Sequence, residues 1–102
     1  MAMTGTARSL PEIMAERMAV VLEVARLNAE RLRQTQQAGG MAIEVLGCHR
    51  RLAEDDSETA RRALDDAMAH DARIQAALAQ CDTQLLALDQ RLEQLDLELA
   101  RS

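Results

Sequence analysis

The chain has 102 residues, enough for one domain, and it contains no Phe, Tyr or Trp, so any core has to be built from Ala, Leu, Val, Ile and Met. A single Pro and four Gly argue against a loop-rich or all-β fold. The net charge is −5, and residues 55–102 hold eleven acids against five Arg, which argues against direct nucleic-acid binding because phosphate contacts need clustered cations.

The first predicted element is a helix that begins near Ser9. Ser9 and Glu12 have the spacing of a capping box, in which each side chain accepts a hydrogen bond from the other residue's backbone amide. Pro11 is tolerated in the first turn of a helix, where its missing N–H has no intrahelical partner. We therefore predict a disordered tail over residues 1–8 and a single helical domain over residues 9–102.

Apolar residues recur along the first arm in steps of four and three, which is the 3.5-residue repeat of a coiled coil. This first-arm seam consists of Met18, Leu22, Ala25, Ala29, Leu32, Gln36, Gly39, Ile43, Leu46, Arg50 and Ala53. We predict that it faces the second arm. A second stripe, formed by Ile13, Val20, Val24 and Leu27, lies beside the seam and has no obvious place in an isolated hairpin. This stripe is either part of a broad core face or a second surface for another subunit, and we favour the second because helices bury apolar stripes against neighbours.

Two segments can reverse the chain. The acidic segment 55–58 has capping-box spacing between its first and last residues, and a turn there leaves two arms, about 10–54 and 57–101. A turn at Gly39-Gly40 would instead give three helices, with a short one over 41–53. Because the first-arm seam keeps its phase through the glycines, we favour an all-α, long antiparallel helical hairpin with a kink or break at the Gly pair.

The second arm carries the most regular pattern in the chain. Its seam consists of Ala60, Leu64, Ala67, Asp71, Ile74, Leu78, Cys81, Leu85, Leu88, Leu92, Leu95 and Leu99. Steps of four and three alternate without a fault, so this arm has to lie against another helix. Asp71 is the only charged member, and it is either a solvated position or a polar residue that sets the register of the pairing.

Other residues of the second arm point to an interaction surface. Leu86 and Leu97 fall on a common side away from the main seam. Asp82, Asp89 and Asp96 recur every seven residues along one edge of it. Such a row is either a solvated face or a set of charges that selects a basic partner helix. We count these five residues, with Val20, Val24 and Leu27, as predicted partner-binding residues.

No residue set predicts catalysis, a cofactor or a metal site. The soft metal ligands are Cys48, His49, His70 and Cys81, and they lack the close pairing of a structural zinc site. Cys81 is predicted to be a small core residue. Cys48 is predicted to be more exposed, which would permit an intermolecular disulfide in vitro. There is no phosphate-binding loop or catalytic triad, so we do not expect an enzyme.

The predicted function is protein–protein interaction through helix-on-helix packing, as an adaptor, chaperone or assembly subunit. In architecture the predicted hairpin resembles the small helical-hairpin stalks and chaperones of bacterial secretion systems, and no residue is carried over from that likeness. We expect a bundle completed by a second copy or by a helical partner protein. The apolar run at 18–22 is far short of the ~20 residues of a membrane span, so we expect a cytoplasmic protein without a membrane partner. The alternative is a membrane-surface or nucleic-acid-associated regulator that uses Arg26, Arg31 and Arg33.

Overall fold

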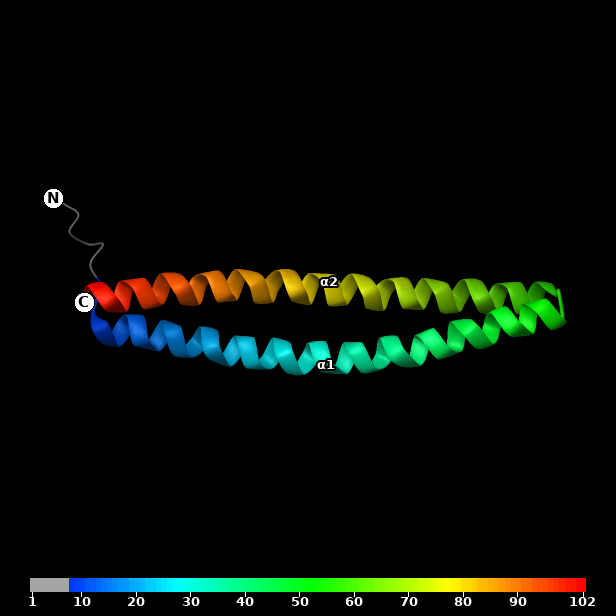
Figure 1. Ribbon diagram of the computed structural model, residues 1–102, viewed down its shortest axis with the longest axis horizontal. Helices are drawn as coiled ribbons and strands as arrows, with labels where there is room; N and C mark the ends of the chain where they lie inside the picture. Colours follow the sequence, from blue (N-terminus) through cyan, green and yellow to red (C-terminus); the bar gives the residue numbers. More distant parts are fainter. Residues whose placement is uncertain (1–7) are drawn as a thin grey trace. The chain divides into compact units, whose positions relative to one another are not determined.

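The computed structural model describes residues 8–102, and these form two long helices, α1 (Leu10–Glu54) and α2 (Glu58–Arg101), with no strand in that part of the chain (Figure 1). The predicted all-α antiparallel hairpin with its turn at 55–57 is confirmed. Residues 1–7 of the predicted tail lie outside the described residues. The chain divides into two compact units, each of which pairs part of α1 with part of α2. Unit 1 joins the chain up to Ala29 with Thr83–Ser102, and unit 2 is Glu30–Asp82.

Side-chain caps explain where both helices begin. At the start of α1, the Glu12 amide donates to Ser9 Oγ at 3.3 Å and the Ser9 amide donates to Glu12 Oε1 at 3.2 Å, so the predicted capping box is confirmed. At the start of α2, the predicted box over 55–58 is wrong. The cap is Ser57, whose Oγ accepts a hydrogen bond from the Ala60 amide at 3.1 Å. The Asp55 amide instead donates to the Arg51 carbonyl at 2.8 Å, in the last turn of α1.

The Gly pair does not interrupt α1. Gly39 and Gly40 are both helical, and no described residue has a positive φ. The break and the three-helix alternative are therefore wrong. A Cβ added at either glycine would meet no atom within 4 Å, so neither residue is required by close packing inside the chain. Both glycines weaken the helix, by roughly 1 kcal/mol each relative to Ala, and its continuity rests on the packed turns on either side.

The predicted seam of α2 is confirmed along its whole length. Every apolar residue of that seam is buried or partly buried, and Leu95 is completely inaccessible at 0% exposure. Asp71 is partly buried in the same row. The pattern is reliable here because α2 offers one continuous apolar row, so no other face competes for the partner helix.

The predicted seam of α1 is wrong. All of its residues from Met18 to Ala53 are exposed, and the face that packs on α2 lies next to it. This inner face of α1 consists of Ile13, Val20, Val24, Leu27, Ala38, Met41, Val45, Cys48 and Leu52, all buried or partly buried. The stripe predicted to lack a place in the hairpin is therefore its core. Gly39, a member of the predicted seam, faces open space instead of α2.

Each unit has its own hydrophobic cluster. In unit 1 the buried residues Ile13, Val20 and Leu95 are surrounded by partly buried apolar side chains, namely Val24, Leu88, Leu92 and Leu99. In unit 2 the buried set is Met41, Cys48, Leu64, Ala67 and Ile74. Small Cys and Ala side chains alternate there with large ones, which lets the two helices lie close together.

Candidate functional site

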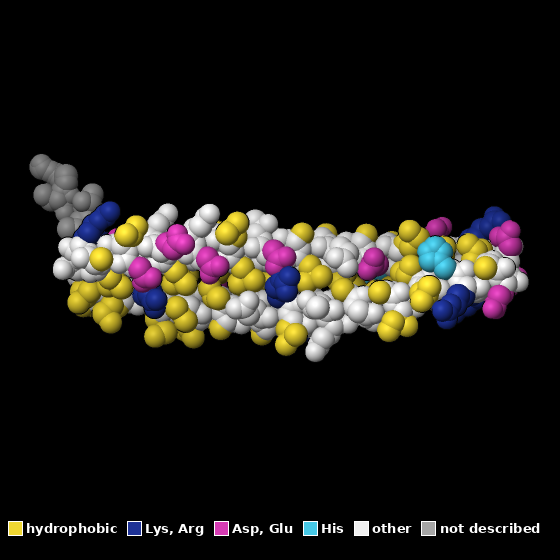
Figure 2. Space-filling view, in the orientation of Figure 1, with side chains coloured by type: hydrophobic (Ala, Val, Ile, Leu, Met, Phe, Trp, Pro, Cys, Tyr) yellow, Lys and Arg dark blue, Asp and Glu magenta, His cyan; other side chains and the backbone are white. Residues whose placement is uncertain are grey.

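The principal candidate site is the exposed apolar face of α1. Eight of the eleven exposed large hydrophobic side chains lie on α1, and they are Leu10, Met14, Met18, Val21, Leu22, Leu32, Ile43 and Leu46. We call these residues, with the small residues between them, the outer face of α1. Figure 2 shows hydrophobic side chains along the edge of α1 that is turned away from α2. Single exposed leucines are normal on protein surfaces, whereas a row at helical spacing marks an interaction surface.

The outer face exists because α1 carries two apolar rows and α2 covers only one. Four of the eight large outer residues lie five residues after an inner one: Met18 follows Ile13, Leu32 follows Leu27, Ile43 follows Ala38 and Leu46 follows Met41. Five residues turn an α-helix by roughly 140° beyond a full turn, so both rows cannot contact one partner helix. The second row therefore needs a second partner to be buried.

In unit 1 the outer face is a compact apolar patch. Leu10, Met14, Met18 and Leu22 follow one another at four-residue intervals, which places them on one side of the helix. Met14 and Met18 also line a shallow surface hollow together with Leu99 and the ion pair between Arg17 and Asp96. Methionine side chains adapt to differently shaped apolar partners, so this patch suits binding.

In unit 2 the outer face is nearly free of charge. Ile43 is the most exposed large hydrophobic residue of the described chain, at 74%, and Leu46 lies on the same side of the helix. From Gln34 to His49 the only formally charged residue is Glu44. Interface centres are depleted in charge, and this stretch has that composition.

The predicted acidic row pairs mainly with α1 of the same chain. Asp96 accepts a hydrogen bond from Arg17 at 2.8 Å, and Asp82 accepts one from Arg31. The Arg31 guanidinium lowers the pKa of the Asp82 carboxyl, chiefly through that hydrogen bond. Asp89 forms no ion pair within residues 8–102. Two acids of the row, Asp82 and Asp96, therefore form ion pairs inside the hairpin, which the sequence analysis did not predict. The signal was their spacing of fourteen residues, which matches the spacing of Arg17 and Arg31.

The other cations of the first arm are paired as well. Arg26 forms an ion pair with Glu23, and Arg33 forms one with Glu30, three residues earlier in each case. A hydrogen bond from Arg26 lowers the pKa of Glu23, and a hydrogen bond to Glu30 raises the pKa of Arg33. The three arginines that the sequence offered for an anionic partner therefore lie against carboxylates of their own chain.

The predicted partner-binding residues divide into two groups. Val20 and Leu27 are buried and Val24 is partly buried against α2, so the structure does not leave them available to a partner. Leu86 and Leu97 are exposed, at 60% and 57%, as expected for residues away from the seam. They are isolated on α2, whereas the outer face of α1 is a row.

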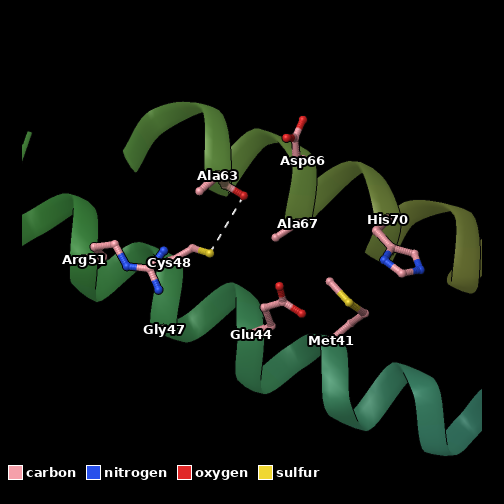
Figure 3. A pocket seen from close by; sticks show the side chains of 9 residues that line it. All are labelled: Met41, Glu44, Gly47, Cys48, Arg51, Ala63, Asp66, Ala67 and His70. Carbon is pink, nitrogen blue, oxygen red and sulfur yellow. Dashed lines mark hydrogen bonds between the residues drawn. The ribbon is translucent and has the colours of Figure 1, made fainter. Parts of the chain in front are cut away.

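A surface hollow near the turn brings several polar side chains together (Figure 3). It is lined by Met41, Glu44, Gly47, Cys48 and Arg51 from α1 and by Ala63, Asp66, Ala67 and His70 from α2. Cys48 is buried, with Sγ 3.8 Å from the Ala63 carbonyl oxygen, so the prediction that it is more exposed is wrong. Cys81 is buried as predicted, and both thiols are free. No group of three metal-binding side chains occurs within residues 8–102.

An ion-pair cluster joins the start of α1 to the end of α2 in unit 1. Glu16 pairs with Arg8 and Arg91, each at 2.6 Å, and Arg8 also pairs with Glu98 at 3.0 Å. The hydrogen bonds from Arg91 and Arg8 lower the pKa of Glu16 to about 2. Arg8 was assigned to the tail from the sequence, and it is anchored here because its guanidinium bridges two carboxylates.

Comparison with known proteins does not narrow the function further. The chain matches no protein-family model, no curated protein and no solved structure. Over residues 8–102, neither helix contains a stretch with the length and apolar character needed to cross a bilayer.

Proposed function

We propose that the protein is a non-enzymatic interaction module that binds helices along the outer face of α1. The observation that carries the proposal is the set of exposed Met, Leu and Ile side chains, most of them three or four residues from the next within a unit, on a helix whose other side is already packed. Adaptors, chaperones and assembly subunits all use such surfaces, so the proposal covers these roles. Its place of action is the cytoplasm, where free thiols such as Cys48 and Cys81 stay reduced.

The energetics favour a helical partner. Full burial of a Leu, Ile or Met side chain stabilises by roughly 1.5–3 kcal/mol, so burying the exposed half of each gives about 1 kcal/mol per residue. The eight exposed side chains of the outer face together supply about 8 kcal/mol, which is of the same order as the entropic cost of association, so a contact of modest affinity is expected. Within a unit, exposed side chains three or four residues apart lie on one side of α1, and such a row fits another helix better than a peptide strand or a small ligand.

The competing function, a membrane-surface or nucleic-acid-associated regulator, has less support. Binding to anionic lipid or phosphate needs cations that are free to form new contacts. Arg26, Arg31 and Arg33 each donate to a carboxylate of the same chain. Those contacts would have to be broken first. Co-sedimentation with anionic vesicles at low salt separates the two functions, and we expect the protein to stay in the supernatant.

Site-specific photo-crosslinking in the native cell tests the proposal. A photoreactive amino acid replaces Met18 or Leu32 on the outer face, and in a matched control it replaces Gln90, an exposed residue of α2. We expect strong crosslinks to protein from both α1 positions and weak ones from Gln90. Equal crosslinking at all three positions, or crosslinks only to lipid or nucleic acid, would overturn the proposal.

A further inference from the structure

We infer that the unit 2 part of the outer face, residues 32–50 of α1, pairs antiparallel with the same segment of a second copy, with Ile43 of each chain packed on the partner's Gly39. The inference rests on the proposed function, because it names the occupant of part of the same surface. It specifies the face of α1 that is buried, the antiparallel orientation of the two helices and the residues that meet.

The glycines supply the first argument. Gly39 and Gly40 lie in the middle of an unbroken helix with ordinary backbone geometry, and a Cβ on either would meet no atom within 4 Å. Each therefore weakens α1 without any steric need inside the chain. Glycine in such a place allows another backbone to approach closely. Ile43, one turn after Gly39 on the same side, is the side chain most in need of cover.

The register follows from the spacing of the outer face. In an antiparallel coiled coil, core residues of one helix pack against core residues of the other. Residue numbers rise along one helix as they fall along its partner. Placing Ile43 on the partner's Gly39 fixes the remaining layers. Gln36 then meets the partner's Leu46, and Leu32 meets the partner's Arg50. Gly40 lies near the partner's Gly40 at one edge of this contact, and Ala42 lies near the partner's Ala42 at the other. Both edges are therefore lined by small residues.

The scarcity of charged residues on this part of α1 supports contact with a second copy, and the position of Arg50 favours the antiparallel orientation. Between Gln34 and His49 the helix carries no formal charge except Glu44, and Glu44 lines the hollow between the helices of unit 2. Two copies therefore meet without like charges at the centre of the contact. A parallel pair would place Arg50 against the partner's Arg50 and Gly39 against the partner's Gly39, which combines repulsion with a void. The antiparallel pair avoids the repulsion because the stem of Arg50 covers the partner's Leu32. It avoids the void because the partner's Ile43 packs on Gly39.

The contact predicts modest affinity. One helix pair of this length lies at the small end of specific interfaces, so we expect a dissociation constant on the order of micromolar. Sedimentation equilibrium over about a hundredfold range around that value should show a monomer–dimer equilibrium. Ile43→Glu should abolish the dimer, because it buries an unpaired charge against the partner. Leu86→Glu, an exposed leucine on α2, is the matched control and should leave the dimer unchanged.

The register has a separate test. When Ile43→Cys and Gly39→Cys proteins are mixed and oxidised, the mixed disulfide should exceed either homodisulfide by several-fold, because only positions 43 and 39 face each other across the pair. Native Cys48 and Cys81 are buried, and peptide mapping assigns the linked positions. Gly39→Ala should raise the melting temperature of the dilute monomer and weaken the dimer at least tenfold, since the new methyl occupies the space that receives the partner's Ile43.

The outcomes separate this inference from the proposed function. A strict monomer that still crosslinks to other proteins from Met18 and Leu32 would overturn the second copy as occupant and leave the interaction module standing. A dimer that survives Ile43→Glu, or a preference for the Ile43→Cys homodisulfide over the mixed one, would overturn the face or the register. A dimer lost in Ile43→Glu, with circular dichroism unchanged and Leu86→Glu unaffected, supports it.

Discussion

At the scale of single residues, α1 contains a partly buried polar side chain with an atom that has no hydrogen-bond partner among the described residues. Gln34 is partly buried, and its Nε2 donates to Glu30 Oε1 at 3.2 Å. Its Oε1 is buried with no hydrogen-bond partner among the described residues. A buried acceptor without a donor loses its hydration and gains nothing in return.

Replacing this amide should therefore stabilise the protein. We expect Gln34→Leu to raise the free energy of unfolding by about 1 kcal/mol, through removal of the unpaired oxygen and added apolar burial. Urea denaturation monitored by circular dichroism measures the change. Gln90→Leu, on the exposed side of α2, should leave the stability within about 0.5 kcal/mol and serves as the control. A destabilised Gln34→Leu protein would mean that the amide has a partner in solution.

At the scale of elements, the helix ends and the glycines decide local stability. Gly47 is a third helical glycine on α1, and a Cβ added there also meets open space. Gly47→Ala should stabilise the monomer by about 0.5–1 kcal/mol, because alanine loses less backbone entropy on forming a helix. Thermal melts at low concentration check it. Ala42→Gly, at an exposed position of the same helix, should move the melting temperature in the opposite direction by a similar amount.

The ion pairs between the start of α1 and the end of α2 predict a pH dependence. The pKa of Glu16 in the folded chain is about 2, against an ordinary value of 4.5. A lowered pKa means that the ionised carboxylate favours the folded state, so the stabilisation is complete above 4.5 and is lost as the pH falls toward 2. The melting temperature should decline across that window. The effect is moderate because Arg8, Glu16 and Arg91 are all partly exposed to solvent.

A substitution isolates the contribution of Glu16. The Glu16→Gln protein should be less stable than the wild type at pH 7, and the difference should shrink markedly toward pH 2, where about half of the folded wild-type carboxyls are protonated. Glu93→Gln, on an exposed side of α2, should keep the wild-type profile between pH 4.5 and 2. Parallel profiles for wild type and Glu16→Gln would contradict the role of the cluster.

At the scale of the whole molecule, the cores are made within one chain. Ile13, Val20 and Leu95 are buried in unit 1, and Met41, Leu64 and other residues are buried in unit 2, without a second chain. Each unit therefore has a hydrophobic core formed within a single chain. The sequence-based expectation that a second copy or a helical partner completes a bundle stays a prediction. In the proposed function, association uses the outer face of α1 and adds to the packing already present in each unit.

This arrangement predicts helicity that survives dilution. Circular dichroism should report a mainly helical chain well below the micromolar dissociation constant proposed for the dimer. Leu27→Ala should lower the free energy of unfolding of the monomer by about 2–4 kcal/mol, since it leaves a cavity between α1 and α2. Leu97→Ala, an exposed leucine, should change it by less than about 0.5 kcal/mol. Unfolding of the wild type on dilution would show that the hairpin depends on its partner.

The sequence by itself determined the helices, the α1 cap at Ser9, the turn at 55–57 and the packed face of α2. Each depends on neighbours along the chain or on a single uninterrupted apolar row, and local patterns report such features directly. The packed face of α1 could not be determined in this way, because two rows of similar apolar character lie side by side on it. Neither row differs enough in hydrophobicity to identify the one that meets α2.

Only the tertiary structure decided between the two rows. The inner face places Arg17 and Arg31 beside Asp96 and Asp82, and it brings larger side chains into the seam than a row containing Gly39 would. These pairings join residues 79 and 51 positions apart, so they become visible only when both helices are in register. Because the inner face of α1 packs on α2, Ile43 and the other large residues of the outer face stay exposed. For this reason α1, and not α2, carries the candidate interaction surface.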